Sequence, residues 1–291
     1  MRGRPGGSGA LVACLLLLSA CSGGDSARRT LIQNKGSDTM VNIAQSWAEN
    51  YRAVAPDVGV AVSGGGSGTG IAALMNGTVD IANASRSIKP AEREQIKTNN
   101  GIEVVEHTVA ADAVAFFVHS DNPLDGLTLG QLACIYGEGG DCENWADVGV
   151  QVPGCAGQQI IRISRQSNSG TYVFVRESVL GKTRDFRLGS RDMQGSKDVV
   201  DLVSKTPCSI GYSGLGYATD ELKTICVSQD GESACVVPTT QAAKDGSYPL
   251  SRPLFMYTLG EPQGQAAVYL NWIKSAAGQE IVVKTGFIPI S

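Results

Sequence analysis

The sequence predicts an α/β protein, because two kinds of pattern alternate along the chain. Short apolar stretches typical of strands are followed by stretches in which apolar residues recur at the helical period. Such alternation favours parallel sheets with crossover helices. The length of 291 residues is sufficient for two domains with well-buried cores.

The individual elements follow from these patterns in chain order. The expected strands are residues 58–62, 103–109, 113–119, 160–164, 209–213 and 254–258. The expected helices contain Ala44, Trp47, Ala48, Tyr51 and Ala55 in the first, Ile71, Leu74 and Met75 in the second, Phe174 and Val179 in the third, and residues 263–284 in one or two more.

The N-terminus has the pattern of a secretory signal peptide. Arg2 and Arg4 precede an apolar run at 10–18, which is too short for a permanent membrane span. The following Leu-Ser-Ala-Cys at 18–21 resembles a bacterial lipoprotein box, which implies cleavage before Cys21 and lipid attachment to it. The alternative is an ordinary signal with an incidental cysteine. We expect a lipoprotein signal peptide at 1–20 and a flexible tether at 21–29.

The charge and histidine content exclude some classes of function. Without Arg2 and Arg4 the formal net charge falls from −4 to about −6, which argues against nucleic acid as a partner. The only histidines are His107 and His119, and no Cys-x-x-Cys pair occurs, so the spacing of a zinc site is absent. We expect neither a metal nor a cofactor.

Six cysteines follow Cys21, and an even number in an exported chain favours disulfides over buried free thiols. Asp230-Gly231 lies midway between Cys226 and Cys235, and Asp-Gly favours a two-residue hairpin turn. In that register Cys226 faces Cys235 in a non-hydrogen-bonded pair, whose separation suits a disulfide. For the remaining cysteines, nearness in the chain and position just before strands favour two further pairs: Cys134 with Cys142, and Cys155 with Cys208.

Three short polar stretches each stand just before a helical pattern. They are residues 36–39 (GSDT), 66–70 (GSGTG) and 168–171 (NSGT), and the second continues a glycine run that begins at 64. Because serine and threonine are good N-cap residues, one explanation is three capped helices. The other explanation is an anion site, since helix N-termini offer free N–H groups, and glycines allow close approach.

Arg165 supports the anion site, because it lies four residues before Ser169 and its planar fork suits a tetrahedral oxyanion. Competing motifs fail. The glycine run has no lysine for a Walker A loop, and Thr69 occupies the place of the last glycine in a nucleophile elbow at Ser67.

Six motifs give the chain a resemblance to a known family. They are GSDTM (36–40), GGGSGTGIAAL (64–74), DIANASRSIKPAE (80–92), SRQSNSGTYVF (164–174), SIGYSGLGYA (209–218) and YPLSRPLFMYT (248–258). On these motifs, which stand in family order, the chain resembles the PstS family, the phosphate-binding proteins of bacterial ABC transporters. The resemblance covers nearly all of the chain after the signal.

This resemblance implies a type II periplasmic binding-protein fold, with two α/β lobes joined by a two-strand hinge and the ligand in the cleft. We expect lobe one at 30–112 plus 255–291 and lobe two at 113–254, with the crossings near 110–115 and 251–256. The residues that match the family's phosphate-binding positions are Thr39, Met40, Ser67, Gly68, Ser85, Arg86, Arg165, Ser169, Gly170 and Thr171.

One position departs from the family pattern. Well-known members have an aspartate where this chain has Arg86, and that aspartate accepts the proton of hydrogen phosphate. Two alternatives stay open for Arg86: contact with phosphate or pairing with Glu92. Asp38 is either a replacement proton acceptor or a helix cap that faces away.

The resemblance implies a monomeric, lipid-anchored receptor outside the cytoplasmic membrane, facing the periplasm or cell exterior. It would bind inorganic phosphate and deliver it to an ABC permease driven by a cytoplasmic ATPase, without chemistry on the ligand. The alternatives are a secreted phosphatase on the same fold, a receptor for another tetrahedral oxyanion, and a phosphate sensor without transport.

Overall fold

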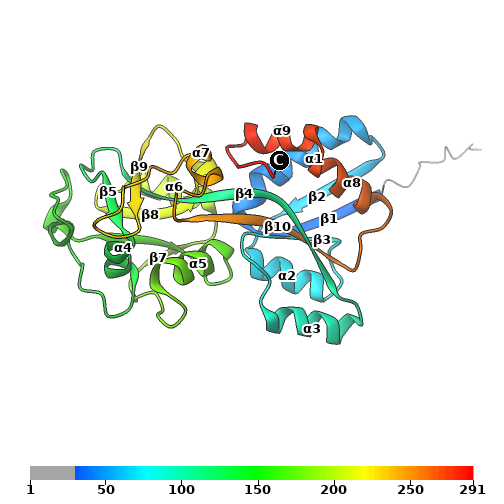
Figure 1. The fold of residues 1–291 in the computed structure, drawn as a ribbon, viewed down its shortest axis with the longest axis horizontal. Helices are drawn as coiled ribbons and strands as arrows, with labels where there is room; N and C mark the ends of the chain where they lie inside the picture. The colour runs from blue at the N-terminus through cyan, green and yellow to red at the C-terminus, as the bar shows by residue number, and fades with distance from the viewer. Residues whose placement is uncertain (1–29, 291) are drawn as a thin grey trace, which may run out of the picture.

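The computed structural model describes residues 30–290. The expected signal peptide, Cys21 and the tether lie outside the described residues. Figure 1 shows two α/β halves placed side by side, with the strands β4 (Val104–His119) and β10 (Ser251–Leu259) running between them. No helix among residues 30–290 is long and apolar enough to cross a membrane.

The half that contains the C-terminus is built on a parallel core of three strands. β1 pairs in parallel with β2 on one side and β3 on the other, and β10 closes this part of the sheet antiparallel to β3. Helices cover both faces, as Figure 1 shows. The elements of this half are β1 (Thr30–Gly36), α1 (Val41–Val54), β2 (Val58–Ser63), α2 (Ser67–Met75), β3 (Ile81–Ala84), α3 (Pro90–Asn100), α8 (Gly264–Lys274) and α9 (Ala276–Lys284).

The second half continues the same hydrogen-bonded sheet in the order β4-β8-β6-β7, and β9 pairs with β4 and β5. β6 is parallel to β7 and β8, while β8 is antiparallel to β4. The elements of this half are β5 (Gly126–Thr128), α4 (Leu129–Tyr136), β6 (Ile161–Arg165), α5 (Gly170–Val175), a π-helical turn (Arg176–Leu180), β7 (Arg191–Met193), α6 (Ser196–Val203), β8 (Ser209–Gly214), β9 (Leu222–Ser228) and α7 (Thr240–Lys244).

The two strands expected at 103–109 and 113–119 are one continuous strand, β4. Its first part pairs with β10, and its part from Val114 pairs with β8 and β9. The β10–β4 register shifts between Leu254 and Phe255, where the ladder is irregular. β4 exchanges β10 for β8 after Ala113, and β10 gains β3 as a second partner from Phe255. On these changes we propose the predicted lobe boundaries at 112/113 and 254/255, and we call the halves lobe one and lobe two.

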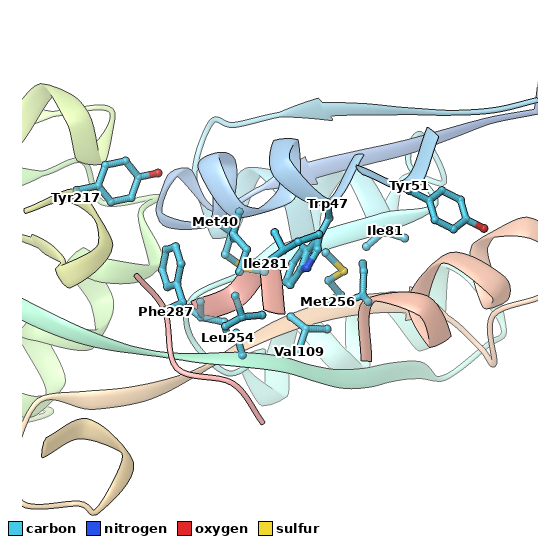
Figure 2. Close-up of a cluster of buried hydrophobic side chains, with 14 of the residues drawn as sticks. Met40, Trp47, Tyr51, Ile81, Val109, Tyr217, Leu254, Met256, Ile281 and Phe287 are labelled. Atoms are coloured by element: carbon cyan, nitrogen blue, oxygen red, sulfur yellow. The ribbon is translucent and has the colours of Figure 1, made fainter. Parts of the chain in front are cut away.

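The core beneath α1 follows the predicted helical period. Trp47 and Tyr51 are fully buried, and the indole N–H of Trp47 donates to the carbonyl of Gly278 (2.8 Å). Figure 2 shows Trp47 lying among Ile281 of α9 and Met256 of β10. Full burial of such side chains contributes roughly 2–3 kcal/mol each, so this cluster fixes α1, and with it the loop at its N-terminus.

Three disulfides pair the six cysteines of residues 30–290 as expected: Cys134–Cys142, Cys155–Cys208 and Cys226–Cys235, with Cα atoms 5.0 to 5.4 Å apart. All three lie in lobe two. The hairpin register predicted for the last pair, however, is wrong.

Val227 was expected opposite Ala234, but it exchanges both backbone hydrogen bonds with Val236 (2.9 and 3.0 Å). Neither Asp230 nor Gly231 has the positive φ that a type I′ turn needs. The Asp230 carboxylate instead accepts the N–H groups of residues 232 and 233. Asp230 therefore stabilises a longer loop through its side chain.

Candidate functional site

The three polar stretches picked out in the sequence meet between the lobes. Each follows the carboxyl end of a strand of the parallel parts of the sheet: β1, β2 and β6. In α/β folds ligands bind at these ends, because the loops there and the helix N-termini point to the same edge. The first stretch passes through a 3₁₀ turn (Asp38–Met40) before α1, the second begins α2 at Ser67, and the third begins α5 at Gly170.

Lobe one contributes a cluster of buried serine hydroxyls. The hydroxyl of Ser37 donates to that of Ser85 (2.9 Å), and the backbone N–H of Ser85 donates to the hydroxyl of Ser67 (3.0 Å). All three residues are at most 2% exposed. Ser67 is thus bonded to the end of β3, and it does not act as a side-chain cap of α2.

Lobe two contributes Ser169, Gly170 and Thr171. The hydroxyl of Ser169 caps α5 by accepting from the N–H groups of Thr171 (3.2 Å) and Tyr172 (3.4 Å). The hydroxyl of Thr171 lies 2.8 Å from that of Thr39 in lobe one. A bound oxyanion could exchange with such hydroxyl–hydroxyl hydrogen bonds, because each hydroxyl can turn its proton toward a negative oxygen.

Arg165 brings a positive charge to this interface and is fully buried. Its guanidinium donates to the carbonyl of Gln194 (2.7 Å) and the hydroxyl of Ser196 (3.0 Å), and it lies 3.4 Å from the Asp38 carboxylate. Burial lowers the pKa of Arg165, and Asp38 opposes this shift. Because arginine keeps its proton in proteins, the group remains a cation beside Asp38 and Ser196.

Asp38 faces into the interface, so it is not the outward cap considered from the sequence. One carboxylate oxygen accepts the backbone N–H of Gly65 (2.8 Å), and the other faces Arg165. The tyrosine hydroxyl of Tyr217 in lobe two also donates to the Asp38 carbonyl (2.8 Å). Asp38 therefore connects the glycine run to lobe two.

The glycine run packs directly on the loop before α5. The N–H of Gly68 donates to the carbonyl of Asn168 (3.0 Å), and the Asn168 amide donates to the carbonyl of Gly65 (2.8 Å). Gly66 has φ +91°, and a Cβ there would lie 2.7 Å from the Asn168 carbonyl oxygen. Because the glycines of this run have no side chains, the lobes can make close contact in this structure. The sequence did not reveal this role of the glycines.

Gly170 occupies the corresponding position on the other side. A Cβ built on Gly170 would collide with the hydroxyl oxygens of both Ser67 and Ser85. The lobes can meet at this point only because residue 170 has no side chain.

Met40 and Arg86, also expected in the site, have other partners here. The side chain of Met40 is buried in the core of lobe one, as Figure 2 shows, and its N–H donates to the carbonyl of Ser37 (3.0 Å). Both terminal nitrogens of Arg86 bind the Glu92 carboxylate (2.8 and 2.7 Å). Of the two alternatives for Arg86, the structure has the ion pair with Glu92.

Arg252 and Asp112 lie in the site but were missed as candidates. Arg252 belongs to the motif at 248–258 and lies in the hinge strand β10. Its guanidinium donates to the hydroxyls of Thr171 (2.9 Å) and Thr39 (3.3 Å) and to the Asp112 carboxylate (2.8 Å). A signal was present in the sequence for Asp112, because it interrupts the apolar run at 109–118, and a buried strand rarely holds a charge without a partner.

The comparisons with known proteins agree with this geometry. A profile of the PBP superfamily domain matches residues 22–277. The chain is 36% identical over 269 residues to the phosphate-binding protein PstS of Pseudomonas aeruginosa, which covers 89% of this chain and 83% of that protein. It is 32% identical over 278 residues to protein SphX of Synechococcus elongatus, with coverages of 91% and 79%.

Solved structures give the same result for the fold. The TM-score is 0.80, at 28% identity, with a phosphate ABC transporter substrate-binding protein of Clostridium perfringens with bound phosphate, and the match covers 90% of this chain and 100% of that one. The TM-score is 0.69, at 27% identity, with an ABC-type phosphate transport receptor of Vibrio cholerae, with coverages of 88% and 99%.

Two α/β lobes on a two-strand connection, with polar helix starts converging between them, define a binding protein of the type II periplasmic class. Within this class the chain belongs to the PstS family of phosphate-binding proteins.

Proposed function

We propose that this protein binds inorganic phosphate between its lobes and delivers it to an ABC permease. The observation that carries the proposal is Arg165, a fully buried cation that contacts the Ser196 hydroxyl of lobe two and faces Asp38 of lobe one across the interface. A buried guanidinium beside hydroxyl and helix N-terminal donors is a suitable environment for a small oxyanion. The relatives named for phosphate binding share the chain's family and fold.

The expected ligand groups are those predicted from the sequence. Arg165 supplies the charge, while the hydroxyls of Thr39, Ser67 and Thr171 supply neutral donors. The backbone groups at Met40, Gly68 and Gly170 and the hydroxyls of Ser85 and Ser169 complete the set. Arg86 remains a proposed outer contact, because an ion pair with Glu92 occupies its terminal nitrogens.

Binding would be coupled to closure of the lobes about β4 and β10. Hydrogen bonds between the lobes, such as Thr39 with Thr171 and Gly68 with Asn168, hold the two sides together. A ligand that contacts both sides adds to this attraction and so favours the closed arrangement. The permease would then recognise the closed form.

We also propose that the protein acts without catalysis, as an exported monomer anchored by a lipid on Cys21. The family's members serve transport, and the site's hydroxyls bond one another or cap a helix, rather than pairing with a histidine as an activated nucleophile would. Mass spectrometry of the mature protein tests the lipid on Cys21, and sedimentation tests the monomer.

Calorimetry of the soluble mature chain against phosphate, arsenate and sulfate tests the proposed function. We expect tight phosphate binding with one ion per chain. No heat of binding for phosphate, with binding of another oxyanion, would assign the site to that ion. Release of nitrophenol from nitrophenyl phosphate would show a phosphatase and contradict the non-catalytic role.

A further inference from the structure

Arg252 lies at the crossing between the lobes, on β10, and faces Asp112 on β4. The two residues are register partners in the antiparallel β4–β10 ladder. They are 3% and 1% exposed, respectively. Burial lowers the pKa of Arg252 and raises that of Asp112, and each partner opposes the other's shift. The two residues form a buried ion pair in the strands that connect the lobes.

The guanidinium of Arg252 reaches both sides of the candidate site. One terminal nitrogen donates to the hydroxyls of Thr171 in lobe two (2.9 Å) and Thr39 in lobe one (3.3 Å), and the other donates to the carbonyl of Ser85 (3.0 Å). The Asp112 carboxylate accepts hydrogen bonds from Nε of Arg252 (3.2 Å) and from one of its terminal nitrogens (2.8 Å). The terminal nitrogen that binds Asp112 is the one that donates to Thr39 and Thr171, and the other donates to Ser85, so the guanidinium contacts three residues that we assigned to the ligand.

Stability alone gives no reason for this pair. Replacing a buried ion pair by apolar residues of similar volume is often neutral or stabilising, because burying two charges costs several kcal/mol each. The Arg252–Asp112 pair lies where the hydroxyls of Thr39 and Thr171 meet. Its presence there is more simply explained if the pair is part of the binding site.

Arg252 can also be reached from one side of the hinge. It forms part of the wall of a cavity of ≈ 330 Å³. The charged residues of that wall are Arg86, Lys89, Arg252 and Glu177, so positive side chains outnumber negative ones. The ring of Phe174, which lines the same cavity, lies 5.2 Å from the guanidinium carbon of Arg252 and supports its orientation.

We infer that Arg252 is a second cationic ligand of the bound oxyanion, contributed by the hinge and held in place by Asp112. This inference rests on the proposed function. Arg165 and Arg252 then approach the ion from different sides, one from lobe two and one from the connection. Because the guanidinium touches Thr39 and Thr171 together, its full set of contacts exists only when the lobes are closed.

The test removes the charges of Arg252 and Asp112 together, so that neither is left buried without its partner. In the double variant Arg252→Gln/Asp112→Asn both charges disappear, and the two amides can still hydrogen-bond across the strands. We expect cooperative thermal unfolding as in the unmodified protein, with phosphate affinity reduced by about 30-fold or more, as for the loss of a buried charged contact. Arg162→Gln, which removes another buried arginine of lobe two outside the site, is the control and should leave phosphate affinity unchanged.

The outcomes separate this inference from the proposed function. If the unmodified protein binds no phosphate, the proposed function fails. If it binds phosphate and the folded double variant binds it equally well, Arg252 is not a ligand, while the proposed function stands. If the double variant does not fold, Arg252→Lys decides: it keeps the charge but lacks the fork, so we expect about 10-fold weaker binding. Unchanged affinity in Arg252→Lys would then overturn the inference.

Discussion

Both lobes bring hydroxyl groups to the site, and lobe two adds the guanidinium of Arg165. Ser37, Ser67 and Ser85 in lobe one bond one another and are held by the ends of β1 and β3. Arg165 in lobe two is held by Gln194 and Ser196 of its own lobe. In this comparison lobe two supplies the charge of Arg165, while lobe one supplies uncharged serine hydroxyls. Substitutions in the two lobes should therefore weaken binding by different amounts.

The largest effect is expected from the lobe that carries the charge. Arg165→Ala should weaken phosphate binding by roughly 2–5 kcal/mol, because a desolvated anion loses its cation. This corresponds to about 30-fold or more in the dissociation constant, measured by calorimetry. An unchanged dissociation constant in a folded variant would remove Arg165 from the site.

The next effect concerns contact between the lobes rather than either lobe alone. Gly170→Val would place a side chain against the hydroxyls of Ser67 and Ser85 and so oppose closure. We expect about 3 kcal/mol weaker binding, as for overpacking, with a smaller loss of thermal stability, because the clash arises between lobes. Gly231→Val, at an exposed loop glycine with open space around it and no positive φ, is a control for the loss of a glycine. Native affinity in Gly170→Val would show that the lobes bind phosphate without this close contact.

A pair of serine variants compares the lobes directly. Ser67→Ala should weaken phosphate binding by about 1.5 kcal/mol, because one donor to a charged group is lost. Ser169→Ala removes the side-chain cap of α5 and should lower stability by about 1 kcal/mol in addition to any change in affinity. For both variants, thermal unfolding measures the change in stability and calorimetry measures the change in phosphate affinity. A stability loss with native affinity in Ser67→Ala would mean that this serine only shapes the glycine loop.

The smallest effect on binding is expected from the disulfide at the far end of lobe two. Cys226→Ser/Cys235→Ser should lower the stability of lobe two by about 2–3 kcal/mol and leave phosphate affinity nearly unchanged, because the bridge closes a short loop away from the site. Non-reducing peptide mapping of the unmodified protein should recover these cysteines in one linked peptide. Linkage of either cysteine to another partner would contradict the structure.

Much of the fold was predictable because its signals are local. The helix of Trp47 and Tyr51 has its apolar side chains on one face, and Ser169 sits at the cap position of α5 as its hydroxyl predicts. Arg165 was found through its spacing to Ser169. The hairpin register failed because the Asp230 side chain bonds its own loop, a competitor to the two-residue turn that the dipeptide alone does not reveal.

By itself the sequence determined which helices and strands form, which cysteines are available, and which short stretches begin helices with free N–H groups. These features depend on residues a few positions apart. Only the tertiary structure decided that β4 is one strand, that Gly68 and Gly170 face the opposite lobe, and that Arg252 pairs with Asp112. The last two residues are 140 positions apart in the chain. Their contact depends on strand register across the hinge, which the packing of both lobes sets and no local pattern encodes.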